Sequence, residues 1–311
     1  MSPATVAGVP PAGAAQLFKA LGDETRLTIV RLLALTDLRS GELVARLSLP
    51  QNAVSYHLKH LRELGLLRDR RSHADGRDVY YHLDLDRLQA LYQQAGQALS
   101  PALVPAGPAA GGADILGADP PLRVLFLCTH NSARSQLAEA ILRLCGGDAV
   151  EVASAGDHPS VVHPMAIALM EQHGIDPRAH TAKSLDGLVG QAFDYVITVC
   201  DRANDRCPMF PDDPLRIHWS FPDPTAIDDE TARTRAFATI WLELNTRVGH
   251  LLNLPHPTSG RRPGASSLAG VREPDMLEGA PRPGGATGRL GGLTGTLGGL
   301  TRKLGAPRER E

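Results

Sequence analysis

The chain is poor in cysteine and has no long apolar run. Only four of its 311 residues are cysteines, and none precedes Cys128. In a reducing compartment such a set is typical of catalytic or metal-binding thiols and not of a disulfide framework. No apolar run approaches the roughly 20 residues of a membrane span, and residues 1–16 lack the basic and apolar segments of a secretory leader. We therefore expect a cytoplasmic protein without membrane contact.

The near-neutral net charge of −2 hides a division along the chain. Residues 14–100 are slightly basic, whereas residues 122–253 are acidic, so any anion site in the second segment must be local. The length predicts more than one domain. Stretches rich in Pro, Gly and Ala predict a linker at 101–121 and a disordered tail at 254–311.

The strongest motif of the second segment joins a short apolar strand to a cysteine, five small or polar residues and an arginine. Cys128 follows Val124-Leu-Phe-Leu, and Arg134 precedes a helical pattern. A strand, loop and helix in this order direct backbone N–H groups and a helix N-terminus toward one point. The positive potential there favours a Cys128 thiolate, and the Arg134 fork can hold two oxygens of one anion. The competing interpretation is a buried strand-end cysteine beside a surface arginine. The residues expected to bind an oxyanion are Thr129, His130, Asn131, Ser132, Ala133 and Arg134.

Alternating patterns in the second segment predict an α/β fold with a parallel sheet flanked by helices. The expected strands lie near 122–127, 150–154 and 194–199, and the expected helices near 135–144, 164–173 and 228–252. Asp223 lies between two prolines that stiffen its loop, which suits a general acid, although an Asp-Pro pair alone is usually a turn. Cys200 and Cys207 favour a dithiol/disulfide pair over metal ligands, because metal pairs are usually closer in sequence.

The first segment predicts short helices followed by a hairpin. Asp23 is expected to cap a helix through Leu35 in which Leu27 is one of the apolar positions, and Ser40 to cap a helix over 41–47. A third helix begins after Pro50 and stops at Gly65. Strands at 66–71 and 77–83 then flank a turn at 74–76. This order predicts a helix-turn-helix with a basic wing, and the competing interpretation is a small helical module with a solvated basic hairpin.

A winged helix-turn-helix reads bases with its second helix and anchors phosphates with its wing. The side chains expected to contact DNA are Gln51, Asn52, Ser55, Tyr56, His57, Lys59, Arg62, Arg71 and Arg77.

Three stretches of the first segment resemble the arsenical-resistance repressor (ArsR-type) winged-helix family. They begin at Leu21 (Leu-Gly-Asp-Glu-Thr-Arg-Leu), at Val54 (Val-Ser-Tyr-His-Leu-Lys-His-Leu) and at Gly76 (Gly-Arg-Asp-Val-Tyr-Tyr). The resemblance implies a homodimer that binds a twofold operator and releases it on binding a metal or metalloid. Members that sense arsenite directly use cysteines here, and this segment has none. Its histidines are not spaced like the family's zinc ligands, so we expect no metal site and leave the inducer open.

The second segment resembles thioredoxin-coupled arsenate reductases, which have the low-molecular-weight tyrosine phosphatase fold. The resemblance rests on the loop from Cys128 to Gln136, Ser154-Ala-Gly, Val196 to Cys200, Cys207-Pro and His218 to Pro224. It implies that Ser135 steadies the thiolate and that Asp223 protonates the departing oxygen. It further implies that Cys200 attacks the Cys128–arsenic adduct, that Cys207 resolves the resulting disulfide, and that thioredoxin or a similar dithiol is the electron donor. Ala133 stands where family members often have a second cysteine.

No bound cofactor is expected, apart from a possible monovalent cation held by Asn131, Glu139 and Ser154. Cys145 is expected to be a packed small residue. Two other functions remain open on the sequence alone. One is a tyrosine phosphatase fused to a repressor, and the other is a regulator whose second domain is only a thiol sensor.

Overall fold

The computed structural model describes residues 12–74, 76–99 and 121–254. The predicted linker, apart from Pro121, and the predicted disordered tail, apart from Leu254, lie outside the described residues, as does Asp75 in the expected turn. Within the described part of the chain, no helix is long and apolar enough to cross a membrane.

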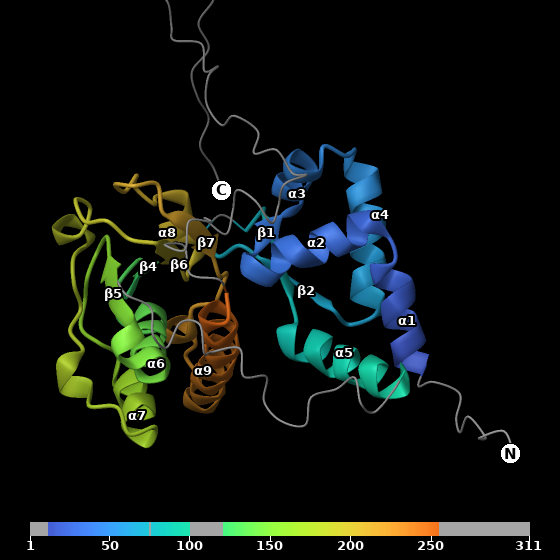
Figure 1. Cartoon of the computed structure of the whole chain (residues 1–311). Helices are drawn as coiled ribbons and strands as arrows, with labels where there is room; N and C mark the ends of the chain where they lie inside the picture. The colour runs from blue at the N-terminus through green and yellow to red at the C-terminus, as the bar shows by residue number, and fades with distance from the viewer. Residues whose placement is uncertain (1–11, 75, 100–120, 255–311) are drawn as a thin grey trace, which may run out of the picture. The chain divides into compact units, whose positions relative to one another are not determined.

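The N-terminal part is a winged helix-turn-helix, as the sequence predicts (Figure 1). Its three short strands form an antiparallel sheet in the order β1-β3-β2, in which β2 and β3 are the wing. The elements in chain order are α1 (Ala12–Leu21), α2 (Glu24–Leu35), β1 (Leu38–Arg39), α3 (Ser40–Leu47), α4 (Gln51–Glu63), β2 (Leu67–Arg71), β3 (Val79–Leu83) and α5 (Leu85–Leu99).

Local chemistry sets most of these boundaries. Asp23 caps α2 by accepting the Arg26 N–H at 2.9 Å, and Gly65 follows α4 with a φ of 69°, which favours glycine. Ser40 is not the cap of α3 but its first residue. Arg39 precedes it, and the Arg39 N–H bonds to the Glu42 side chain at 2.6 Å. The apolar pattern was also wrong at Leu27, which is 40% exposed.

The C-terminal part is a parallel four-stranded sheet with helices, which confirms the predicted α/β fold. Its strand order is β5-β4-β6-β7. The strands and α-helices are β4 (Leu122–Cys128), α6 (Arg134–Gly146), β5 (Val150–Gly156), α7 (Pro164–Gln172), β6 (Tyr195–Thr198), α8 (Asp201–Asp205), β7 (Leu215–His218) and α9 (Glu230–Leu252). Short 3-10 helices cover Gly147–Ala149, Pro177–Ala179, Leu185–Gly187 and Pro224–Ala226.

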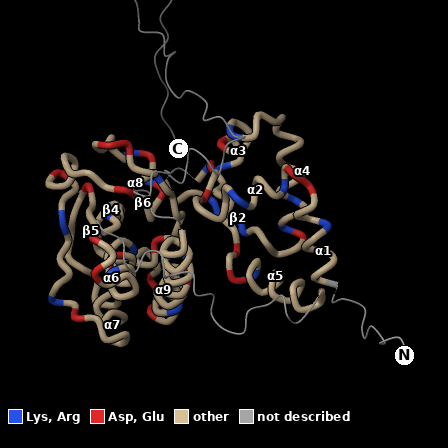
Figure 2. The backbone as a smooth tube through the Cα atoms, viewed as in Figure 1, with Lys and Arg blue, Asp and Glu red and all other residues tan. Residues whose placement is uncertain are grey.

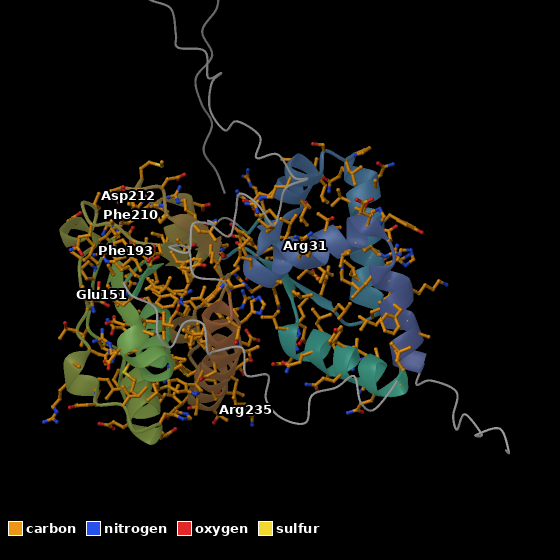
Figure 3. All side chains as sticks on the ribbon, in the orientation of Figure 1. Arg31, Glu151, Phe193, Phe210, Asp212 and Arg235 are labelled. Atoms are coloured by element: carbon orange, nitrogen blue, oxygen red, sulfur yellow. The ribbon has the colours of Figure 1, made fainter. Side chains whose placement is uncertain are left out.

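Strand β4 lies in the interior of this sheet, so both of its faces are covered. From Val124 to Cys128 every residue is buried, which explains the continuous apolar run in the sequence. Helix α6 packs on β4, β5 and α9, and Figure 1 shows α6, α7 and α9 grouped beside one another. Phe193 and Phe210, labelled in Figure 3, meet edge to face with 5.8 Å between ring centroids. This packing fixes where β4 ends, and therefore where Cys128 lies.

The described residues all fall within one compact unit, and buried ion pairs join residues that are distant in sequence. The Asp37 carboxylate is fully buried and accepts hydrogen bonds from Arg247 at 2.9 and 3.1 Å and from the Ser220 N–H at 2.6 Å. Arg70 of β2 donates to Asp201 at 2.9 Å. Because buried charges are costly unless paired, these residues are structural partners.

Candidate active site and DNA-binding face

The loop from Thr129 to Ala133 is held by hydrogen bonds that turn its carbonyl groups outward. The carbonyls of Thr129, His130 and Ser132 accept the N–H groups of His158, Ser160 and His163 at 2.8 to 3.0 Å. In a trans peptide the C=O and the next N–H point in opposite directions. The N–H groups of His130, Asn131 and Ala133 therefore point away from that segment. The loop thus presents donors to one side, as an oxyanion site requires.

The Cys128 sulfur lies among these donors. Cys128 is 4% exposed, its Sγ accepts the Asn131 N–H at 3.1 Å, and Ser135 Oγ lies 2.9 Å away. Helix α6 begins at Arg134, so its N-terminal dipole also faces the loop. Donors and a positive helix end favour a negatively charged sulfur. The buried cysteine that the competing interpretation foresaw is thus accompanied by an arrangement suited to a thiolate.

Arg134 and Asp223 face each other across the loop. Arg134 is 7% exposed; its guanidinium donates to Asp223 Oδ2 at 2.9 Å and to the Phe221 carbonyl at 3.1 Å. Burial raises the pKa of the Asp223 carboxyl, but the Arg134 charge and hydrogen bonds from Thr225 outweigh it and leave that pKa below its usual value. Asp223 is therefore ionised and paired with Arg134 at neutral pH when no anion is present.

Cys200 lies near the end of β6, the strand paired in parallel with β4. Its sulfur is 3.4 Å from Thr129 Oγ1 in the anion loop. Burial raises the pKa of the Cys200 thiol, and the nearby Cys128 raises it further although Arg134 opposes them. Burial also raises the pKa of Cys207, which lies just beyond α8. All four cysteines are free thiols in this structure.

Asn131 organises the loop from inside, with its φ of 48° in the left-handed region. Its Nδ2 donates to Ser135 Oγ at 2.9 Å and to Ser154 Oγ at 2.7 Å. Its Oδ1 accepts the Lys183 N–H at 2.7 Å and Gln136 Nε2 at 2.9 Å. An amide side chain has two donor hydrogens and two acceptor lone pairs, so Asn131 is saturated. Sequence reasoning missed Gln136 and Lys183, because nothing in their spacing links them to the loop.

Gly156 was also missed, although it ends the strand β5 beside β4. A Cβ at this position would lie 2.6 Å from the Thr129 carbonyl oxygen and 2.9 Å from the Asn131 nitrogen. Both atoms belong to backbone that other hydrogen bonds hold in place, so neither can move away easily. Glycine is therefore required here for close approach of β5 to the anion loop.

Replacement of Gly156 by alanine is expected to displace the anion loop. Overpacking of this kind costs roughly 1–3 kcal/mol of stability, and we expect kcat/KM for an aryl phosphate to fall at least about tenfold because donors must be placed within tenths of an ångström. Steady-state kinetics and urea unfolding measure both effects. Gly187→Ala is the matched control, since a Cβ there meets nothing within 4 Å. Equal kinetics for both variants would contradict the assigned role.

The predicted DNA-contacting residues lie on α4 and on the wing. All are exposed except His57, which is partly buried and lies 3.5 Å from Asp23. Figure 2 shows basic positions on α4 and β2 with acidic ones between them. Lys59 lies 3.9 Å from Glu63 and Arg62 lies 3.1 Å from Asp69. The positive charge of this face is therefore partly balanced within the protein.

Within the described ranges, no group of three or more His, Cys, Asp or Glu residues could hold a metal ion. A thiol, an arginine fork and a carboxylate around a loop of N–H donors define a cysteine-dependent oxyanion-binding domain. The winged helix defines a second, regulatory module.

Comparisons with known proteins place both parts in families. Residues 123–256 match the family described as low molecular weight phosphotyrosine protein phosphatase, and residues 23–69 match bacterial regulatory protein, arsR family. An arsenate reductase of Halalkalibacterium halodurans is 42% identical over 126 residues, which are 40% of this chain and 91% of that protein. Arsenate reductase 1 of Staphylococcus epidermidis is 40% identical over 105 residues, 34% of this chain and 80% of that protein.

The chain therefore belongs to the low molecular weight phosphotyrosine protein phosphatase family, in which its curated relatives are arsenate reductases, and it also carries an arsR-family helix-turn-helix. A solved structure titled "An arsenate reductase in the phosphate binding state" aligns with 42% of this chain and 96% of its own at 30% identity, with a TM-score of 0.36. The family match and the sheet order, and not this low TM-score, assign the fold.

Proposed function

We propose that the protein reduces arsenate to arsenite at Cys128 and binds operator DNA through its winged helix. The observation that carries the first proposal is the Cys128 sulfur inside a loop of N–H donors, with Arg134 opposite and a second thiol, Cys200, against the same loop. Relatives 40 to 42% identical that are named arsenate reductases support arsenate as the oxyanion.

The first chemical step is attack of the Cys128 thiolate on arsenic. The loop N–H groups and the Arg134 fork hold the arsenate oxygens, and the Ser135 hydroxyl donates to the thiolate before attack. Asp223 is ionised in the anion-free site, so it cannot act as an acid there. Arsenate draws Arg134 away from Asp223 and brings its own proton. The neutral Asp223 carboxyl then protonates the departing oxygen, which leaves as water.

The second half is a disulfide relay. Cys200, as a thiolate, attacks the Cys128 sulfur, the S–As bond breaks, and its electron pair reduces arsenic from the +5 to the +3 state. Arsenite leaves and a Cys128–Cys200 disulfide remains. Cys207 then attacks Cys200, which frees Cys128 and forms a Cys200–Cys207 disulfide. An external dithiol such as thioredoxin supplies the two electrons that reduce it. The raised pKa values of Cys200 and Cys207 keep both protonated until these steps, which limits premature oxidation.

The direct test is arsenate reduction by the purified full chain with thioredoxin, thioredoxin reductase and NADPH. Arsenate-dependent NADPH oxidation with one equivalent of arsenite per NADPH is the expected result. Hydrolysis of an aryl phosphate without any arsenite would overturn this proposal and leave a phosphatase. The assay also tests thioredoxin as donor, since glutaredoxin with glutathione can be substituted for it. A cytoplasmic location, where such donors occur, is part of the proposal.

The DNA-binding proposal rests on the exposed face of α4 and on the wing. Winged helices of this kind act as dimers on twofold operators, so we propose a homodimer through the N-terminal part. Arg71 is exposed at the end of β2, where a wing contacts the phosphate backbone. Arg70, next to it, pairs with Asp201 and is not assigned to DNA.

Arg71→Ala is expected to weaken binding to DNA of any sequence, because a phosphate contact carries no sequence information. The slope of log K against log salt should decrease by about one per arginine removed. Fluorescence anisotropy with a labelled random duplex at several salt concentrations measures this slope. Arg178→Ala, which removes an exposed arginine paired with Asp176 in the C-terminal part, is the control. An unchanged slope for Arg71→Ala would remove the wing from the DNA interface.

A further inference from the structure

The residues expected to hold a monovalent cation surround a buried carboxylate that already has two cationic partners. Glu139 is 2% exposed. Its Oε1 accepts Arg143 Nη2 at 2.7 Å, and its Oε2 accepts Lys183 Nζ at 3.1 Å. Ser154 Oγ donates to the same Oε2 at 2.5 Å. A further cation would have to approach two positive charges, so this site does not fit the expected ion.

The Lys183 ammonium lies where a bound cation would need its ligands. Its Nζ contacts Glu139 Oε2 and, at 3.3 Å, the Thr181 carbonyl oxygen. Carboxylate and carbonyl oxygens are ligands that hard cations use. Lysine here supplies the same charge through a covalent tether, so no ion has to be captured from solution.

This charge is connected to the thiol through a chain of directed hydrogen bonds. The Glu139 carboxylate can only accept, so Ser154 Oγ must donate to it and can then accept from Asn131 Nδ2. Asn131 Nδ2 also donates to Ser135 Oγ, which leaves the Ser135 proton free to point at the Cys128 sulfur 2.9 Å away. The polarity of the chain therefore begins at the Glu139 anion and ends with a donor aimed at the thiolate.

We infer that Lys183 replaces a monovalent cation as the countercharge of Glu139 and acts as a positioning residue for Cys128. The backbone of Lys183 strengthens the arrangement, because its N–H bonds to Asn131 Oδ1 at 2.7 Å. One residue thus holds both ends of the chain of hydrogen bonds, Glu139 with its side chain and Asn131 with its backbone. The active site of this chain accordingly works without added potassium or sodium.

The test compares wild type, Lys183→Met and Lys19→Met in two salts, KCl and tetramethylammonium chloride, at equal ionic strength. Methionine keeps the length and the backbone N–H of Lys183 and removes the charge. Lys19 is an exposed lysine on α1 and serves as the control. The readouts are the melting temperature and the alkylation rate of Cys128 by iodoacetamide at pH 7, measured by mass spectrometry of its peptide. Neither readout uses arsenate, so the result stands whether or not the proposed reductase activity is found.

The wild type and Lys19→Met should give the same values in both salts. Lys183→Met should alkylate Cys128 about tenfold more slowly in tetramethylammonium chloride, a change equivalent to one pKa unit, and KCl should restore much of the loss. A wild-type protein whose melting temperature rises in KCl would overturn the inference, because a cation would then bind despite the lysine. Lys183→Met behaviour equal to wild type would also overturn it, as would a loss that KCl does not restore.

Discussion

Cys128→Ser is expected to abolish arsenate reduction and aryl phosphate hydrolysis together. Both reactions need the same nucleophile, and a serine hydroxyl is far less ionised than a thiol in this loop. The arrangement offers no general base to activate a hydroxyl, because Asp223, the carboxylate facing the loop, is paired with Arg134. We expect kcat/KM to fall by roughly 10⁴-fold or more for both substrates, as when a nucleophile is removed from other enzymes.

The control for this prediction is Cys145→Ser, which changes an exposed cysteine on α6. It should keep both activities within about twofold, as surface substitutions usually have small effects. Phosphate binding, measured by protection against thermal unfolding, should persist in Cys128→Ser because the N–H donors and Arg134 remain. Residual arsenate reduction above one-hundredth of wild type would show that another thiol is the nucleophile.

Cys200→Ser is expected to stop arsenite formation while aryl phosphate hydrolysis continues. Hydrolysis needs the Cys128 loop and Asp223 only, whereas reduction of arsenic needs a second thiol to take over the Cys128 sulfur. Arsenite should fall below one equivalent per chain, and aryl phosphate turnover should stay within a few fold of wild type. This variant therefore separates a reductase from a phosphatase with the same loop.

Cys207→Ser provides the second half of that test. In this variant the relay should proceed until a Cys128–Cys200 disulfide forms and then stop. Non-reducing peptide mapping after one exposure to arsenate should find that disulfide and one equivalent of arsenite. Sustained thioredoxin-coupled turnover by either variant would contradict the relay.

Much of the fold could be predicted from the sequence, because its signals are local. The apolar run before Cys128, the Asp23 cap and Gly65 after α4 each determine an element within a few residues. Short or weakly patterned elements were missed. Strand β7 has four residues and α8 has five, which are too few to show a period, and α5 follows the wing without a break at Asp84. Leu27 satisfied the helical spacing but lies outside the N-terminal core.

The candidate site divides in the same way. The spacing of Cys128 and Arg134 within one strand, loop and helix is a local property, so the sequence indicated the anion loop directly. The ionisation of Asp223 could not be predicted, because it depends on Arg134, 89 positions away in the chain. The expected cation was inferred from three residues that do lie together, but the fourth, Lys183, comes from a loop that sequence spacing does not connect to them.

By itself, the sequence determined the order of elements, the nucleophile and its oxyanion loop, because neighbouring residues specify a strand end and a helix start. Only the tertiary structure decided what surrounds that loop. The parallel order β5-β4-β6 brings Gly156 and Cys200 to the same edge as Cys128, since the carboxyl ends of adjacent parallel strands meet there. Burial within that edge then required every charge to be paired, which placed Lys183 on Glu139 and Arg134 on Asp223.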